Sequence, residues 1–114
     1  DLLKATRGYP KEFHLTPKED LLLRHLHEAR SARPEQELRS VIGYEGQSRK
    51  LVTLYIYWLR KKLKAVNVHI NQDYGIGYFI DKDNRERLNM AILERAELPT
   101  RYDIEQEWKS VRAA

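Results

Sequence analysis

Apolar residues recur at helical spacing directly after the Thr16-Pro17 pair. The spacing predicts a helix from about Pro17 to Ala29, with its inner side formed by Leu22, Leu23, Leu26 and Ala29. Thr16 suits the capping position, and Pro17 suits the first helical residue because it has no N–H to satisfy. Glu19 lies three residues after Thr16, where its carboxylate can bond back to the cap. The start of this helix is therefore encoded locally.

Two more helices are predicted between Pro34 and Ala65. Pro34 can open a short helix that stops at Gly43, with its buried side formed by Leu38, Val41 and Ile42. After a loop at 43–47, Ser48 is a plausible cap for a longer helix that extends to about Ala65. A single apolar stripe at i, i+4, i+7 and i+11 runs along this third helix, formed by Val52, Ile56, Leu59 and Leu63.

The periodicity then changes from helix to strand. Residues 68–70 and 78–80 alternate between apolar and polar, and the stretch 71–77 between them is rich in turn formers. This predicts a β-hairpin with a tip of roughly five residues. Because an isolated hairpin is marginal in water, it must pack on the helices. Residues 13–15 also alternate and are a candidate strand beside it.

From Lys82 onward the pattern is helical again. A modest apolar stripe is formed by Leu88, Ala91, Ile92 and Ala96. Leu98-Pro99 breaks this helix, and Thr100 can cap a second one that carries Ile104, Trp108 and Val111. We expect residues 1–81 to form one domain, and residues 82–114 to form a helical extension that packs on the domain or on a partner.

Composition narrows the class of protein. The chain has 114 residues, of which 41% are hydrophobic and 33% charged, which suits one small domain. No apolar run reaches the ~20 residues of a spanning helix, and no secretory leader is recognisable. A cytoplasmic protein is therefore the expectation. The chain has no cysteine, which excludes disulfides and zinc sites built on sulfur.

Positive charge is concentrated in the first two thirds of the chain. Residues 1–80 carry 14 Lys and Arg against 9 Asp and Glu, whereas residues 81–114 carry 7 against 8. One stretch holds six basic residues and no acidic one: Arg49, Lys50, Arg60, Lys61, Lys62 and Lys64. A basic block on one helix is typical of nucleic-acid binding, and also of a solvated helix face.

Three stretches of the chain match the motifs of one known family. FHLTPKEDLL at 13–22 resembles the opening LT-x-x-E-x-x-L-L, and residues 52–63 resemble a recognition helix that ends in I-x-x-L-R-x-K-L. YGIGYFI at 74–80 resembles the wing R-G-x-G-Y-x-hydrophobic. The chain thus resembles the OmpR/PhoB-type effector domain, the DNA-binding domain of response regulators. The resemblance implies a winged helix-turn-helix, mostly α with a small hairpin, whose third helix enters the major groove and whose wing reaches the adjacent minor groove or backbone.

The chain also departs from the pattern of this family. Twelve residues precede Phe13 in the sequence, so we expect neither most of the family's N-terminal four-stranded sheet nor a receiver domain. The loop at 43–47, which contacts RNA polymerase in family members, is short, so the resemblance does not predict an RNA polymerase contact. Tyr74 replaces the wing arginine, and Tyr57 and Trp58 stand where paired arginines commonly face DNA.

The third helix carries the expected DNA contacts opposite its apolar stripe. Lysines there can neutralise phosphates, while Thr53 and the aromatic rings can meet base edges or thymine methyls. The predicted DNA-binding residues are Arg49, Lys50, Thr53, Leu54, Tyr57, Trp58, Lys61, Lys64 and Tyr74. The apolar cluster Leu54-Tyr57-Trp58 also suits a protein interface, or packing beneath the C-terminal helices.

Two functional hypotheses remain open at this point. The first is a sequence-specific regulator that binds duplex DNA, and the alternative is a protein-interaction module on a winged-helix scaffold that has lost DNA binding. A homodimer through residues 82–114 fits both.

His25 and His27 point to different sides of a helix, and His14 and His69 are isolated, so no metal site is predicted. The chain shows no convincing pair of carboxylates and no nucleophile elbow, so neither an enzyme nor a cofactor is expected.

Overall fold

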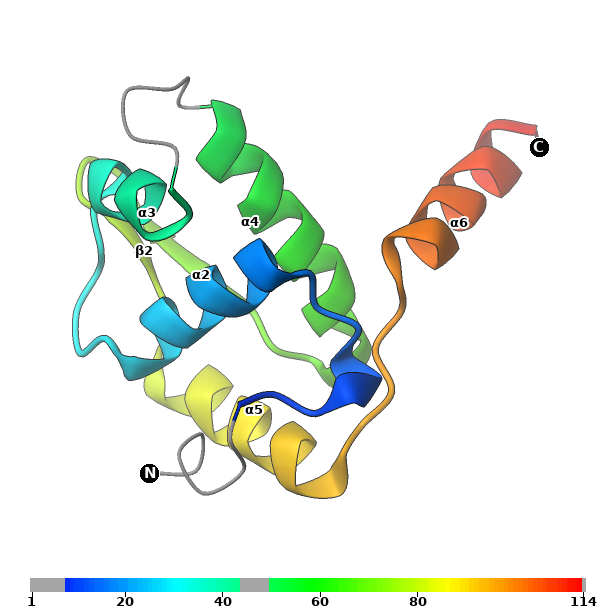
Figure 1. Ribbon diagram of the computed structural model, residues 1–114, viewed down its shortest axis with the longest axis horizontal. Helices are drawn as coiled ribbons and strands as arrows, with labels where there is room; N and C mark the ends of the chain where they lie inside the picture. The colour runs from blue at the N-terminus through cyan, green and yellow to red at the C-terminus, as the bar shows by residue number, and fades with distance from the viewer. Residues whose placement is uncertain (1–7, 44–49, 114) are drawn as a thin grey trace.

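A helical core followed by a hairpin and two further helices forms the protein (Figure 1). This is a computed structural model, in which residues 8–43 and 50–113 are described. The helices in chain order are η1 (Lys11–Phe13), α2 (Pro17–Glu28), α3 (Glu35–Val41), α4 (Lys50–Leu63), η2 (Lys64–Val66), α5 (Lys82–Glu94) and α6 (Arg101–Ala113). The strands, which lie between η2 and α5, are β1 (Asn71–Asp73) and β2 (Gly77–Phe79). The fold is a winged helix-turn-helix, as predicted.

One hydrophobic core holds these elements together. The apolar stripe predicted on α4 is confirmed, because each of its four residues is at most 1% exposed. The buried cluster consists of Phe13, Leu22, Leu23, Leu26, Leu38, Ile42, Val52, Ile56, Leu59, Leu63, Val68, Ile70, Tyr78, Ile80, Leu88, Ala91, Ile92 and Leu98. It includes residues of α5, so this helix shares its core with the three-helix unit.

The capping box predicted at the start of α2 is also confirmed. The Glu19 N–H donates to Thr16 Oγ1 over 3.3 Å, and the Thr16 N–H donates to Glu19 Oε1 over 3.0 Å. Each side chain thus satisfies a backbone N–H at the helix end. The cap also fixes the Glu19 carboxylate inside the protein, where it is fully buried.

The hairpin is shifted relative to its prediction. The first strand was placed at 68–70, but the strand is Asn71–Asp73, paired with Gly77–Phe79, so only three residues form the tip. Val68 and Ile70 are buried and lead into the strand from η2, so their alternation reflects core packing and not strand pairing. The strand predicted at 13–15 is wrong as well, because Phe13 ends a 3-10 helix.

Arg33 takes the place beside the hairpin that was expected for residues 13–15. Its N–H donates to the Tyr78 carbonyl over 2.7 Å, and the Tyr78 N–H donates to the Arg33 carbonyl over 3.0 Å. A Cβ atom on Gly77 would lie 1.9 Å from the Arg33 oxygen, so glycine is required for this close approach. The hairpin is thereby anchored to the segment that joins α2 to α3.

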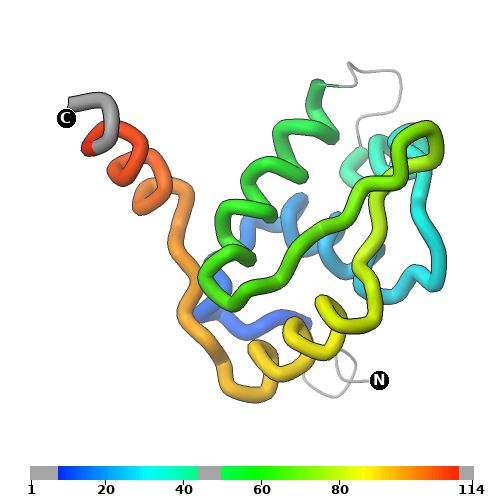
Figure 2. Tube along the Cα trace, turned by 180° about the vertical axis from the view of Figure 1, so that it is seen from behind, coloured from blue at the N-terminus to red at the C-terminus, as the bar shows by residue number. Residues whose placement is uncertain are grey.

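The last helix stands beside α4. Figure 2 shows α4 between the hairpin and α6. The predicted cap of α6 is present, because the Asp103 N–H donates to Thr100 Oγ1 and the Thr100 N–H donates to Asp103 Oδ2. These hydrogen bonds hold the pKa of Asp103 below its ordinary value. The linker before α6 is tied down where the Leu98 N–H donates to the Glu12 carbonyl.

Candidate nucleic-acid interface

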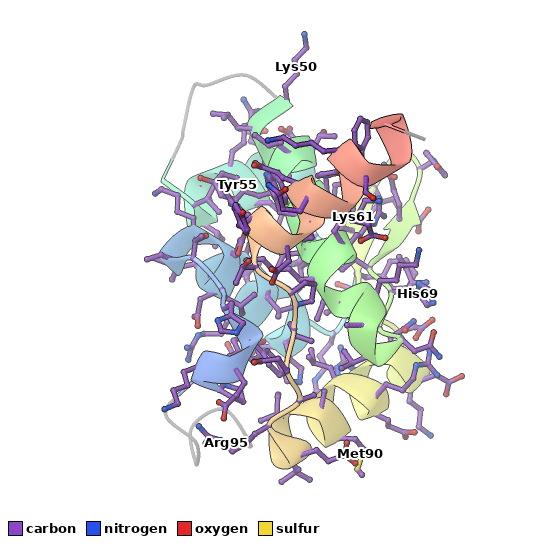
Figure 3. All side chains as sticks on the ribbon, turned by 90° about the vertical axis from the view of Figure 1, so that its right-hand side faces the viewer. Lys50, Tyr55, Lys61, His69, Met90 and Arg95 are labelled. Atoms are coloured by element: carbon purple, nitrogen blue, oxygen red, sulfur yellow. The ribbon has the colours of Figure 1, made fainter. Side chains whose placement is uncertain are left out.

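The outer face of α4 is the side of the helix opposite its buried stripe. It consists of Lys50, Thr53, Leu54, Tyr57, Trp58 and Lys61, and it continues into Lys64, the first residue of η2. Lys50, Thr53 and Lys64 are exposed, and Leu54 keeps 47% of its surface. Figure 3 shows the Lys50 side chain pointing away from the domain at the start of the helix. The structure therefore brings together seven of the nine predicted contact residues on one surface.

One predicted residue, Tyr74, lies apart from this surface. Tyr74 is at the tip of the hairpin and is 85% exposed, beside Ile76 at 56%. Its ring is available to a sugar or backbone next to the groove that receives α4. Arg49 lies outside the described residues, as do Ser48, the predicted cap of this helix, and most of the loop before it.

Lys62 does not belong to the outward basic surface, although it was counted in the basic block. Its side chain is 1% exposed, and its Nζ contacts Glu19 Oε1 at 2.5 Å and the His14 carbonyl at 2.7 Å. Glu19 and Lys62 thus form a buried ion pair that joins the start of α2 to the end of α4. Lys62 stabilises the fold and leaves the outer face to its neighbours.

Arg60 likewise serves the fold. Its Nε and Nη2 both donate to the Ile70 carbonyl, over 3.2 and 2.8 Å. Its guanidinium also lies 5.7 Å from the centre of the Tyr78 ring, within the range of a cation–π contact. Arg60 therefore holds the hairpin against α4, which fixes the position of the wing relative to the helix.

A hollow of 470 Å³ separates the outer face of α4 from the hairpin. It is lined by Thr53, Ile56, Tyr57, Arg60, Lys61, Lys64, Val68, His69, Ile70 and Tyr78. Three of these residues, Arg60, Lys61 and Lys64, are basic, His69 carries an imidazole, and none is acidic. A negatively charged backbone can therefore approach between helix and wing without meeting a carboxylate of the lining.

Tyr57 and Trp58 form an aromatic pair at the edge of the outer face. Their rings meet edge to face, with centres 5.3 Å apart and planes at 74°. Lys61 Nζ lies 5.7 Å from the centre of the Tyr57 ring, which orients this ammonium group beside the pair. Both rings are half-buried. The structure thus leaves Tyr57 partly accessible and directs Lys61 outward beside it.

Arg101 covers part of this aromatic pair from α6. Its guanidinium lies 5.0 Å from the Trp58 ring centre and 5.5 Å from that of Tyr55, and its Nε donates to Glu19 Oε2 over 2.7 Å. The packing of Trp58 beneath the C-terminal helices, one of the three options left open by the sequence, is therefore partly realised. Sequence reasoning missed Arg101, because no local pattern links it to residues 40 to 80 positions earlier.

The histidines are occupied by contacts within the protein or lie apart. His25 contacts Glu37 at 2.6 Å, and His14 contacts Glu97 at 3.0 Å. His27 is buried between Tyr9 and Asn89, and burial lowers its pKa. Within 8–43 and 50–113, no group of three or more His, Asp or Glu side chains could hold a metal ion.

No described helix is long and apolar enough to cross a membrane.

Comparison with known proteins identifies the family. The model of "Transcriptional regulatory protein, C terminal" matches residues 10–80, which hold α2 to α4 and the hairpin. The chain belongs to this family. Its members are OmpR/PhoB-type DNA-binding domains of transcription regulators, so the family predicted from the three motifs is confirmed. The match ends before α5 and α6.

A solved structure supports the same assignment. A RitR mutant is similar to the chain with 31% sequence identity and a TM-score of 0.51, over 59% of this chain and 32% of that one. The chain therefore spans about a third of the length of this relative. The curated proteins contain no match. The family is thus shown by residues 10–80.

Proposed function

We propose that the protein binds duplex DNA with sequence specificity, and that it acts as a transcription regulator with α4 in the major groove. The observation that carries this proposal is the outer face of α4. Its residues are not used by the core, and three of them are lysines that can neutralise phosphates. A major groove about 12 Å wide admits one α-helix. The hairpin then contacts the adjacent minor groove or backbone through Tyr74.

Specificity requires contacts with base edges in addition to phosphate contacts. Thr53, Leu54 and Tyr57 lie between the lysines along the outer face, so they are the side chains that meet the bases when the lysines hold the backbone. A threonine or aromatic side chain can contact a thymine methyl, and a hydroxyl can hydrogen-bond to a base edge. We assign sequence reading to these residues and positioning to Lys50, Lys61 and Lys64.

The deciding experiment is a selection of binding sites from randomised duplexes with the full chain. We expect a common sequence to be enriched, and binding to the enriched duplex to weaken as salt rises. Tyr57→Ala should change the enriched sequence, whereas Lys61→Ala should leave the sequence unchanged. Absence of binding to any duplex at low salt would contradict the proposal and favour the alternative, a protein-interaction module on the same scaffold.

We also propose that the chain pairs through α5 and α6, because two copies bind two half-sites more tightly than one. Met90, Leu93 and Tyr102 support this proposal, since they expose 53%, 62% and 68% of their surfaces. Sedimentation velocity should detect a dimer that Leu93→Lys disrupts, whereas a monomer at all concentrations would refute the pairing.

As a regulator that acts on a chromosome, the protein is proposed to be cytoplasmic.

A further inference from the structure

α6 lies against the outer face of α4 although it is outside the family-matched region. Figure 3, which faces this side of the molecule, shows α6 crossing in front of α4. The two helices enclose a cleft of 360 Å³. Tyr57 and Trp58 form its α4 side, and its α6 side is formed by Ile104, Glu105, Trp108 and Lys109. The last helix thus lies over Tyr57, to which we assign sequence reading, and over Trp58, a predicted DNA-binding residue.

This arrangement conflicts with a bound duplex. The major groove is about 12 Å wide, and one helix with its side chains has a diameter of about 10–12 Å. A groove that receives α4 as far as Tyr57 and Trp58 therefore has no room for α6 beside it.

The apolar contact between α6 and the domain is small. Among the side chains of residues 101–110, only that of Ile104 is buried. Trp108 keeps 49% of its surface exposed although it lines the cleft. Ile104 lies outside the main cluster of buried apolar side chains. α6 can therefore leave α4 without opening the core.

The polar contact between Arg101 and Glu19 can also break while Glu19 keeps its ion pair with Lys62. Arg101 bonds to Glu19 Oε2, while the other carboxylate oxygen of Glu19 holds Lys62 Nζ and the Thr16 N–H. When Arg101 leaves, Glu19 keeps its buried ion pair with Lys62. Departure of α6 therefore leaves no buried carboxylate without a partner, which is the main cost of breaking buried ion pairs.

We propose that α6 is an autoinhibitory element, which covers Tyr57 and Trp58 in the free protein and must leave α4 before this helix enters a groove. The inference rests on the proposed function. The apparent association constant for DNA then equals the intrinsic association constant multiplied by the fraction of molecules in which α6 is undocked. A change that loosens α6 raises this fraction and tightens DNA binding.

The test compares variants of the full chain for binding to a random duplex at low salt, by fluorescence anisotropy. Ile104→Ser removes the buried contact of α6, and Gln106→Ser is the matched control because Gln106 is exposed and uncharged on the same helix. We expect Ile104→Ser to bind about five- to tenfold more tightly than Gln106→Ser.

Arg101→Gln gives a second test. Release of α6 and a direct contact of Arg101 with phosphates predict opposite changes in DNA affinity for this variant. The substitution removes a positive charge, so binding would weaken if Arg101 contacted phosphates. Release of α6 instead predicts tighter binding. Unchanged or weaker binding by both Ile104→Ser and Arg101→Gln, with normal binding by the parental chain, overturns the inference and leaves the proposed function standing. If neither the parental chain nor any variant binds, the proposed function is wrong, and the inference with it.

Discussion

Two adjacent lysines in α4 have opposite roles. Lys61 lies beside the Tyr57 ring on the outer face, whereas Lys62 is turned inward by one residue step and pairs with Glu19. Successive residues of a helix are about 100° apart, so neighbouring charges can belong to different environments. The basic block that first suggested nucleic-acid binding is therefore a mixture of structural and outward-facing cations.

Stability measurements should separate the buried Lys62 from an outward-facing lysine. Lys62→Ala leaves the fully buried Glu19 without its ammonium partner, and we expect it to lower the free energy of unfolding by about 3 kcal/mol. Lys64→Ala, at an exposed position two residues further on, should change it by less than about 0.5 kcal/mol. Urea denaturation followed by circular dichroism measures both. Equal effects of the two substitutions on the free energy of unfolding would show that the Glu19–Lys62 pair does not stabilise the fold.

DNA binding should depend on the outward-facing Lys61. Lys61→Ala should weaken binding to all sequences and reduce the slope of log K against log salt by about 1, because one phosphate contact is lost. Lys82→Ala, which removes an exposed charge from α5 outside the family-matched region, is the control and should leave the slope unchanged. A slope that is identical for both variants would remove Lys61 from the interface.

The hairpin shows how an element is set by contacts outside itself. Its strands span only three residues each, and a hairpin this short is marginal alone. The Arg33 backbone bonds to one edge, and the Arg60 guanidinium binds the Ile70 carbonyl just before β1. The position of the wing relative to α4 therefore depends on residues that the hairpin motif does not include.

Gly77→Ala tests the backbone contact. Its Cβ would overlap the Arg33 oxygen, so the hairpin must move away, and we expect a loss of about 2–3 kcal/mol of stability. Gly75→Ala is the control, because a Cβ there meets no atom within 4 Å and costs only the strain of its φ of +92°. Hydrogen exchange at the Tyr78 amide should accelerate in the first variant alone. Unchanged exchange in Gly77→Ala would refute the role of the Arg33 contact.

The elements could be predicted where the signal is local. Thr16 with Glu19, and the stripe from Val52 to Leu63, each lie within a few helical turns, so spacing alone reveals them. The strand register could not be predicted, because Val68 and Ile70 alternate for the sake of the core while polar Asn71–Asp73 forms the strand. The partners of Lys62 and Trp58 were equally inaccessible, since both are reached only through tertiary folding.

At the scale of the whole molecule, His27 joins three parts of the chain. It lies in α2, with its Nε2 2.8 Å from Asn89 Oδ1 of α5 and its Nδ1 3.1 Å from the Tyr9 hydroxyl. Nε2 therefore donates to Asn89, and in the neutral ring Nδ1 accepts from the Tyr9 hydroxyl. Burial, and to a lesser extent the charge of Arg85, lower the pKa of His27, although the Asn89 bond opposes this.

Stability should therefore depend on pH. Because the folded-state pKa of His27 is lower than that of the unfolded chain, the unfolded chain takes up the proton first, and stability falls as pH drops below about 6.5. One proton gives a slope of at most about 1.4 kcal/mol per pH unit. His27→Gln should flatten the dependence of Tm on pH between about 7.5 and 5. His69→Gln, at an exposed position, should keep the parental slope, and equal slopes in all three proteins would contradict the assignment.

The chain contains only two tryptophans, and both line the cleft between α4 and α6. The protein's indole fluorescence therefore originates entirely from the place where its last helix meets the domain. In a Trp58→Phe variant the remaining indole belongs to the last helix, so its emission maximum and its quenching by acrylamide would record whether that helix is seated or free. No attached dye is needed, and the same optical record can be followed in a stopped-flow instrument while a duplex is added.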